Sequence, residues 1–245
     1  MSEQEQRISW KLIKKPAPQY MGGMIHHWSG LDTPIENNWV DKIGGVKFIP
    51  NNVNNVEHRG NHYFLKYAGN LTAAGYVTDV TIPTEGYTFE LVTRSLATSS
   101  KTYWSASNGM LLDNGGLSSW NERYNPQLSI RTTWKEDKVF TGMYFVKGGT
   151  VLKADLNLVD TFTYVLGTAD DPVSKTYHNG VLLGEGALTN AGIRKLGLGT
   201  RPYGDNITYY NAANLGVYDI RIYPTRLTDE QVLNNHEVDL LTYIS

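Results

Sequence analysis

The sequence of 245 residues contains no cysteine, which excludes disulfide bonds, zinc–thiolate sites and cysteine nucleophiles. Basic residues are not in excess, because 22 Lys and Arg stand against 24 Asp and Glu and give a net charge of −2. We therefore expect no nucleic acid as a partner, since phosphate backbones are bound through positive charge. No apolar run reaches the roughly 18 residues of a membrane-spanning helix, so we expect no membrane partner.

Charged residues are scarce at 19%, whereas aromatic residues reach 11% and include 16 tyrosines. This balance is typical of β-proteins on cell surfaces and virions, although strand propensity alone favours the same residue types. The N-terminal residues Met1–Arg7 are polar and lack the apolar stretch of a secretory signal. If Met1 is the native start, we expect the protein to be made and kept in a cytoplasm or released by lysis. A signal removed for expression would undo this expectation.

Short strand-like segments recur along the chain, separated by turns rich in Gly, Asn and Pro, and this spacing predicts an all-β sandwich. Asn179-Gly180 predicts a tight hairpin turn with positive φ angles. The sequence contains no internal repeat and its composition does not change along its length, so we expect one domain at 21–245, preceded by an arm or edge strand at 1–20. The predicted strands are Met24–Trp28, Val46–Ile49, Tyr63–Tyr67, Tyr76–Ile82, Tyr87–Leu96, Thr102–Leu112, Gln127–Trp134, Val139–Val146, Val151–Leu156, Phe162–Thr168, Val173–His178, Val181–Leu183, Arg194–Gly199 and Leu215–Tyr223.

The last of these strands has the clearest pattern, because polar and apolar residues alternate along Leu215–Tyr223. Side chains of successive strand residues point to opposite faces of a sheet. The alternation therefore predicts that Val217 shares a face with Asp219 and that Tyr218 shares the opposite face with Ile220. This strand is expected to be the final one of the sandwich.

A short helix is expected after that strand. Pro224 ends the strand, because proline lacks the backbone donor that the ladder needs. Thr228 is the expected N-cap, and Gln231 three residues later completes the spacing of a capping box. Leu227 and Val232 are placed to pack across the first turn as a hydrophobic staple.

Four motifs in order resemble one superfamily. They are the Trp-x-Asp-x-x-Gly segment in Trp39–Gly45, the Ile-Pro and Phe-Glu-Leu segment in Ile82–Leu91, the Tyr-x-Asn-Gly turn in Tyr177–Gly180, and the closing Asp-x-Arg-Ile-Tyr with Leu-Thr-Asp-Glu in Asp219–Glu230. Together they resemble laminin-G-like, concanavalin A-like domains of phage structural and bacterial surface proteins. The resemblance covers Met24–Asp239 and implies a two-sheet antiparallel jelly-roll sandwich with a short C-terminal helix. Such folds host many functions, so the motifs specify architecture more than ligand.

Two polar segments rich in aromatic residues, Trp104–Pro126 and Arg201–Asn211, are the best candidates for a ligand surface. Aromatic faces stack on sugar rings, while amide and guanidinium groups bind hydroxyls. The first segment is expected to be a long loop, and long loops in compact domains often carry function. Aromatic residues that plug the end of the sandwich are the structural alternative. The candidate glycan-binding residues are Trp104, Trp120, Asn121, Arg123, Tyr124, Arg201, Tyr203, Tyr209 and Tyr210.

No carboxylate pair has the arrangement of a glycosidase, in which two acids about 5 Å apart face the same bond. Glu136 and Asp137 are adjacent, so on a strand they would point to opposite faces. Asp170-Asp171 and Asp229-Glu230 stand at a turn and at a helix start, where acids serve local structure. We therefore name no catalytic residue and expect a protein that is not an enzyme.

No metal site or cofactor is expected. His26 and His27 would face opposite ways on a strand, and a partly buried histidine near Trp28 explains them better than a shared metal. The resemblance leaves calcium as an alternative, because laminin-G-like domains often bind Ca²⁺ through Asp and carbonyl oxygens at a loop rim. The candidate acids for it are Asp32, Asp41, Asp79, Asp113 and Asp205.

The function expected from the resemblance is that of a non-enzymatic surface protein of a phage virion. It would decorate the capsid or tail, hold glycans, and associate with other virion proteins or with copies of itself, with Ile8–Pro18 as a docking element. A lectin-like module of a bacterial cell surface is the main alternative. A glycan-active enzyme is the third hypothesis, for which Glu90, Glu122 and Asp137 would be tested.

Overall fold

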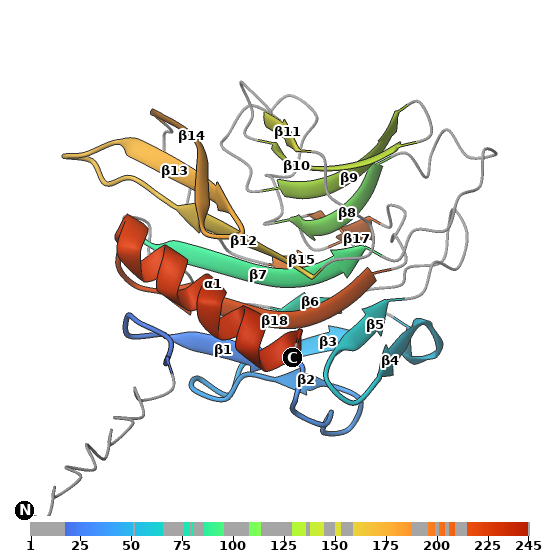
Figure 1. The fold of residues 1–245 in the computed structure, drawn as a ribbon. Helices are drawn as coiled ribbons and strands as arrows, with labels where there is room; N and C mark the ends of the chain where they lie inside the picture. Colours follow the sequence, from blue (N-terminus) through green and yellow to red (C-terminus); the bar gives the residue numbers. More distant parts are fainter. Residues whose placement is uncertain are drawn as a thin grey trace, which may run out of the picture.

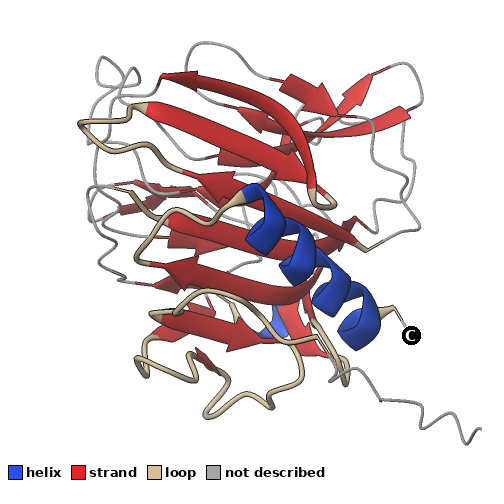
Figure 2. Ribbon diagram, turned by 60° about the vertical axis from the view of Figure 1, so that its left-hand side comes forward, coloured by secondary structure: helices blue, strands red, loops and turns tan. Residues whose placement is uncertain are grey.

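The computed structural model describes most of the chain after its first 17 residues. The described residues are 18–50, 52–65, 76–78, 80, 86–95, 108–113, 129–135, 138–144, 150–152, 159–187, 196–198, 201–203, 206–208 and 215–244. Their secondary structure is almost entirely strand, with one α-helix near the C-terminus (Figures 1 and 2). No helix in this part of the chain is long and apolar enough to cross a membrane.

The first of two eight-stranded sheets is antiparallel and includes the last strand of the chain at its centre. In spatial order it contains β14 (Val181–Ala187), β13 (Val173–His178), β12 (Asp160–Val165), β7 (Thr88–Ser95), β18 (Leu215–Tyr223), β5 (Tyr63–Leu65) and β4 (Val56–His58), and β1 (His26–Ser29) also pairs with β18. A 3-10 turn, η1 (Val53–Asn55), precedes β4.

The second eight-stranded sheet is also antiparallel in every pairing. In spatial order it contains β11 (Thr150–Leu152), β10 (Lys138–Tyr144), β9 (Ser129–Lys135), β8 (Asn108–Asp113), β15 (Leu196–Leu198), β6 (Tyr76–Thr78), β3 (Lys47–Pro50) and β2 (Trp39–Val40). A separate two-stranded ribbon pairs β16 (Arg201–Tyr203) with β17 (Asn206–Thr208).

Apolar side chains from both sheets meet in one core, which confirms the predicted all-β sandwich. The first sheet contributes Phe89 and Leu91 of β7 and Ile220 of β18, while Phe48 of β3 and Leu198 of β15 come from the second sheet, and all five are completely buried. Alternation along each strand directs these residues inward and leaves the intervening side chains of the first sheet on its outer face.

One detail of β18 differs from the sequence prediction. Val217 lies in the core with Ile220, whereas Tyr218 packs on the opposite face against Val92 and Tyr243. The pairing register of β18 with β7 shifts between Val217 and Asp219, which is the pattern of a β-bulge. The extra residue resets the alternation, so the prediction that Val217 shares a face with Asp219 was wrong.

The helix α1 (Asp229–Tyr243) crosses the outer face of the first sheet (Figures 1 and 2). Its start is the predicted one: Thr228 accepts a hydrogen bond from the backbone N–H of Gln231, and the Gln231 side chain accepts one from the N–H of Thr228. Leu227 and Val232 belong to one buried apolar cluster, which confirms the hydrophobic staple.

The hairpin turn at Asn179-Gly180 is confirmed, with φ angles of +51° and +75°. Four short strands, β2, β4, β16 and β17, were not predicted, because two or three residues give no detectable alternation. Strand β8 lies within the segment Trp104–Pro126 and agrees with the predicted strand Thr102–Leu112 over Asn108–Leu112, so the expectation of a loop was wrong there. The division into an arm at 1–20 and a domain at 21–245 stays a prediction, and residues 1–17 lie outside the described residues.

Candidate functional site

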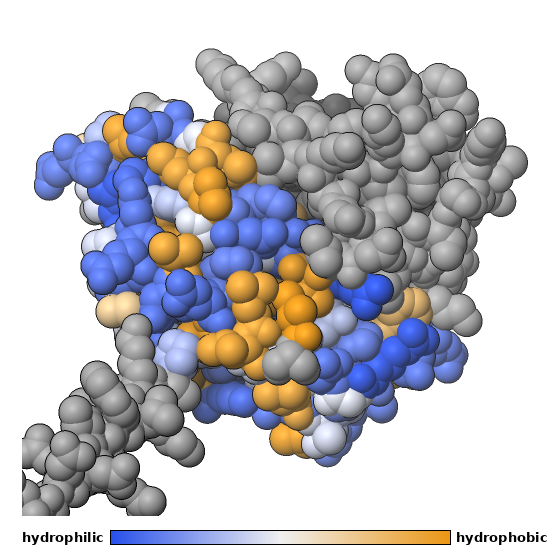
Figure 3. Space-filling model, in the orientation of Figure 1, coloured by the Kyte–Doolittle hydropathy of each residue, from blue (hydrophilic) through white to orange (hydrophobic). Residues whose placement is uncertain are grey.

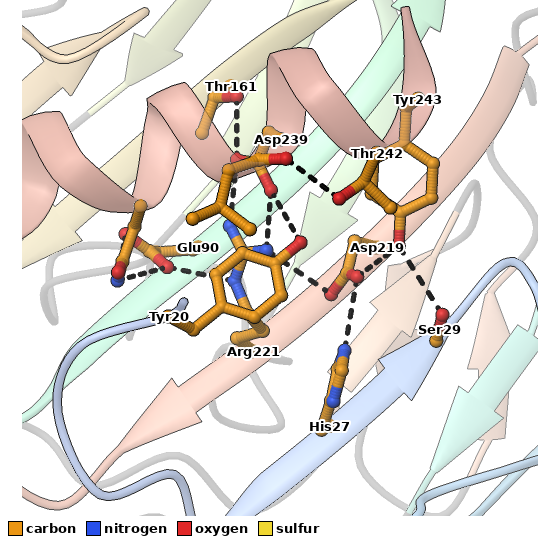
Figure 4. Close-up of polar contacts among 12 residues, drawn as sticks. Tyr20, His27, Ser29, Glu90, Thr161, Asp219, Arg221, Asp239, Thr242 and Tyr243 are labelled. Carbon is orange, nitrogen blue, oxygen red and sulfur yellow. Dashed lines mark hydrogen bonds and ion pairs between the residues drawn. The ribbon is translucent and has the colours of Figure 1, made fainter. Parts of the chain in front are cut away.

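A cluster of charged side chains lies between the first sheet and α1 (Figure 4). Arg221 of β18 donates from Nε to Glu90 of β7 at 2.9 Å, and from Nη1 and Nη2 to the two carboxylate oxygens of Asp239 at 2.6 and 2.8 Å. The three side chains are at most 1% exposed. A guanidinium that meets a carboxylate with two parallel bonds is among the strongest pairings in proteins. This contact joins α1 to the two central strands.

A second branch of the cluster extends from Asp219 toward β1 (Figure 4). Tyr243 of α1 donates its hydroxyl to Asp219, and His27 Nε2 lies 3.1 Å from the same carboxylate oxygen. Ser29 Oγ lies 3.3 Å from the Tyr243 hydroxyl. The final turn of α1, the central strand and β1 are therefore linked through one buried carboxylate.

The segment before β1 closes the cluster from the side. The Tyr20 ring lies 4.1 Å from the guanidinium carbon of Arg221, and its hydroxyl donates to Asp239 at 3.0 Å. The backbone N–H of Met21 donates to the side chain of Asn235 at 2.7 Å. Aromatic stacking on a guanidinium is favourable and also excludes water. Tyr20, expected in the N-terminal arm, is therefore part of the described fold.

The cluster has three carboxylates for one arginine. Burial raises the pKa of Glu90, and Arg221 opposes that shift. Burial also acts to raise the pKa of Asp219, but Arg221 and the hydrogen bond from His27 outweigh it and lower that pKa. Burial therefore favours the protonated form of Glu90, whereas the environment of Asp219 favours its ionised form. One shared proton would reduce the excess negative charge beneath α1.

Two carboxyls that titrate differently are also a feature of acid–base catalysis. Here, however, Glu90, Asp219 and Arg221 are completely buried, and their hydrogen bonds go to one another, to α1 and to neighbouring strands. A substrate would have to displace the helix to reach them. The geometry of this cluster therefore fastens α1 to the sheet.

The two adjacent histidines are arranged as predicted. On β1, His26 Nδ1 lies 2.7 Å from Asp41, while His27 points the other way to Asp219. The ring of His26 stacks on Trp28 with 5.3 Å between ring centroids. Within the described residues no group of three or more His, Cys, Asp or Glu side chains is placed to hold a metal.

The Trp-x-Asp-x-x-Gly motif has a structural explanation in Asp41. Besides His26, its carboxylate accepts the backbone N–H groups of His27 at 2.7 Å, Ile43 at 2.9 Å and Gly44 at 2.8 Å. A Cβ at Gly44 would lie 2.8 Å from that carboxylate, which is why glycine is needed there. Burial opposes ionisation of Asp41, yet the hydrogen bonds prevail and lower its pKa.

These contacts bear on the calcium candidates. The carboxylate of Asp41 is already surrounded by donors, so it has no place for a cation. Asp32 pairs with Lys42 at 3.2 Å. Asp79 and Asp205 lie outside the described residues, and the side chain of Asp113 on β8 is not described either.

The predicted acidic pairs have local roles where the structure describes them. Asp171 pairs with Arg226 in the turn between β12 and β13. Asp229 opens α1 and accepts hydrogen bonds from Tyr177 at 2.7 Å and Lys175 at 2.9 Å. Glu136-Asp137 lies outside the described residues.

Most of the candidate glycan-binding residues also lie outside the described residues. They are Trp104, Trp120, Asn121, Arg123, Tyr124, Tyr209 and Tyr210. Arg201 and Tyr203 are on β16, where only the backbone is described. This strand contacts β15 and β8, and β8 lies between the segments that contain Trp104 and Trp120. The described strands of the two predicted segments, β8 and β16, are therefore in contact.

No protein-family model matches this sequence, and no curated protein matches it. Similar folds occur among solved structures. A Trypanosoma rangeli sialidase in complex with sialic acid matches with a TM-score of 0.60 and 13% identity over 87% of this chain and 32% of its own. The receptor-binding domain of botulinum neurotoxin type G matches with a TM-score of 0.58 and 9% identity over 89% of this chain and 52% of its own.

The chain thus spans about one third of the sialidase and about half of the toxin domain. At these identities the likeness establishes the fold alone. It nevertheless corrects one expectation. The sequence predicted a protein that is not an enzyme, and that prediction is wrong, because several structures of this fold are sialidases, which are enzymes.

Proposed function

We propose that this chain recognises carbohydrate through the loops around the second sheet. The observation that carries the proposal is the shared fold with a sialidase solved with sialic acid and with a toxin receptor-binding domain. The charged cluster beneath α1 is buried, so we do not propose it as the ligand site.

The chemistry of the two loop segments suits such a ligand. Trp120 and Tyr124 offer flat aromatic faces for sugar rings. Arg123 and Arg201 offer guanidinium groups, which pair with the carboxylate of an acidic sugar such as sialic acid. The contact between β16 and β8 supports the proposal that both segments contribute to one ligand site. We therefore favour sialylated glycans over neutral ones.

A glycan array with matched sialylated and desialylated oligosaccharides tests the proposal. We expect binding to the sialylated members, a loss of at least about tenfold for Trp120→Ala, and selective loss of the acidic glycans for Arg123→Gln. Glu57→Gln is the matched control, since Glu57 is 61% exposed on β4 of the other sheet. An array without any signal for the native chain would refute carbohydrate recognition. Binding that survives Trp120→Ala would refute the proposed site.

The fold also permits glycan-active chemistry. Release of free sugar from the bound oligosaccharides, followed by mass spectrometry, separates a binder from a hydrolase. Loss of turnover in Glu122→Gln or Asp137→Asn would assign the reaction to those acids. Glu90→Gln would act through the attachment of α1, so its effect should appear as lower stability.

We propose a virion as the setting, with a bacterial cell surface as the alternative. The support is the sequence resemblance to phage structural proteins and the scarcity of charged residues, which make up 19% of the chain. The partners would be other virion proteins or copies of the same chain. Mass spectrometry of purified phage particles tests the setting, and detection of the chain only in bacterial envelope fractions would favour the alternative.

A further inference from the structure

The two sides of α1 have an unusual distribution of polarity. The side that faces the sheet contains the polar residues Asn235, His236 and Asp239 in addition to Val232, Val238 and Tyr243, and all six are buried. The outward side contains Leu233 and Leu240, which are 47% and 39% exposed. A surface helix normally directs its apolar stripe to the core and its charges to solvent. The arrangement here is partly reversed, because charged and polar side chains attach the helix to the sheet.

The outward apolar residues, with Glu237 between them, form the exposed surface of the helix, called here the α1 stripe. Its members recur at spacings of three or four residues, which places them on one side of the helix. Figure 3 shows an apolar patch over the C-terminal half of α1 in the orientation of Figure 1. The stripe consists of Leu233, Glu237, Leu240, Leu241 and Ile244.

The described chain begins at the edge of this stripe. The side-chain amide of Asn234 donates to the backbone carbonyl of Gln19 at 2.8 Å. Asn234 is three residues before Glu237 and four after Glu230, so all three share one flank of the helix. The 17 residues that precede Pro18 are therefore attached beside the apolar surface.

The sequence of the N-terminal arm is complementary to the stripe. Ile8, Trp10 and Leu12 supply apolar side chains, and the interleaved Arg7 and Lys11 supply positive charge. The exposed acids of the helix are Asp229, Glu230 and Glu237. Extended chain covers about 3.3 Å per residue and a helix about 1.5 Å, so roughly six residues of the arm span the stripe. The arm is therefore long enough to cover the stripe.

We propose that residues 7–15 dock in cis on the α1 stripe. Attachment at Gln19 gives the arm a high effective concentration at its own helix, which favours this occupant over a second copy. The apolar residues of the arm would cover Leu233 and Leu240, and its lysines would pair with the acids on the flank. The arm would then be held against the domain as an additional layer over α1.

The absence of native cysteine allows a direct test. A double variant, Lys11→Cys with Leu240→Cys, should form a disulfide within one chain under mild oxidation. The control pair is Lys11→Cys with Ile35→Cys, because Ile35 is more exposed than Leu240, at 59% against 39%, and lies in the loop between β1 and β2. We expect the first pair to close at least about tenfold faster, at a rate independent of protein concentration. Equal rates would overturn the proposal, and so would dimers in which the two introduced thiols join different chains.

A second measurement avoids any crosslink. Leu240→Lys places a positive charge where the basic arm would bind, and a cation suits the C-terminal half of a helix, so α1 should remain folded. Mass spectrometry then follows limited tryptic cleavage after Lys11 and Lys14. We expect cleavage there to accelerate about tenfold in Leu240→Lys and to stay unchanged in Ile35→Lys. Unchanged cleavage in both variants would refute docking on the stripe.

Discussion

Replacement of Arg221 by methionine is the sharpest perturbation of this fold. Arg221 is completely buried and is bonded to Glu90 and to both carboxylate oxygens of Asp239. Methionine keeps much of the volume but leaves the carboxylates without a counter-charge. Removal of one partner from a buried ion pair costs about 3–5 kcal/mol. That is a large share of the roughly 5–15 kcal/mol by which a typical domain is stable.

The pH dependence of this loss provides a stricter test. Without Arg221, burial should raise the folded-state pKa of Asp219 and Glu90 above their unfolded values near 4. An acid with a raised folded pKa stabilises the fold below its unfolded pKa, and that contribution is lost as pH rises through the folded pKa. The loss of unfolding free energy in Arg221→Met should therefore be larger at pH 7 than at pH 5.

Urea unfolding followed by far-ultraviolet circular dichroism measures both effects. Arg59→Met is the control, because Arg59 and its partner Glu57 are 42% and 61% exposed. Exposed pairs contribute only about 0–1 kcal/mol. A deficit of Arg221→Met as small as that of the control, or one that does not change between pH 5 and pH 7, would refute the proposed role of the cluster.

Three further predictions concern α1 and the Asp41 turn. Thr228→Ala should cost about 1 kcal/mol of unfolding free energy, and Thr228→Ser should restore it, as measured by urea titration. Gly44→Ala should lower the free energy of unfolding by about 1–3 kcal/mol in the same assay, because its Cβ would lie 2.8 Å from the Asp41 carboxylate. Gly23→Ala is the control and should be neutral, because a Cβ at that position would have no other atom within 4 Å. The folded-state pKa of Asp41 is lowered, so its ionised form stabilises the fold above the unfolded pKa near 4, and this contribution is lost as pH falls through the folded pKa. In Asp41→Asn the free energy of unfolding should therefore depend less on pH in the acid range, as urea titration at several pH values would measure.

Local signals made part of the fold predictable. The bounds Val173–His178 and Leu215–Tyr223 agree with the structure at both ends, because turns or proline mark their limits. The capping box at Thr228 depends on four consecutive residues, so one sequence suffices to identify it. Where the determining contacts are neighbours in the chain, pattern alone was enough.

Long-range features were not predictable in the same way. The bulge near Tyr218 exists because β18 must match β7, a strand more than 120 residues earlier in the chain. The cluster around Arg221 combines Tyr20, Glu90 and Asp239, which no spacing rule connects. A charged residue in an alternating strand looks solvent-exposed in a sequence, and only the position of the helix reveals that it is buried.

The candidate glycan-binding residues are a different case. Their selection rested on composition, because aromatic, amide and guanidinium groups occur together in two segments. The structure adds that β16, which is part of one segment, contacts β8, which is part of the other. The side chains of those segments lie outside the described residues, so the site itself stays a prediction.

The partly reversed polarity of α1 argues that its outer surface has a use. Helix propensity does not require exposed apolar residues, since Ala, Glu, Lys and Gln promote helices without them. Ile244 is an example, because it is the C-cap residue, outside the body of the helix, and its apolar side chain is 47% exposed. Asn235 and Asp239 bond α1 to the rest of the fold, so the outer leucines are not needed to hold the helix on the sheet. Exposed apolar residues that are not needed to attach the helix are best explained by a segment that covers them, and the N-terminal arm joins the described chain next to Gln19, beside the stripe.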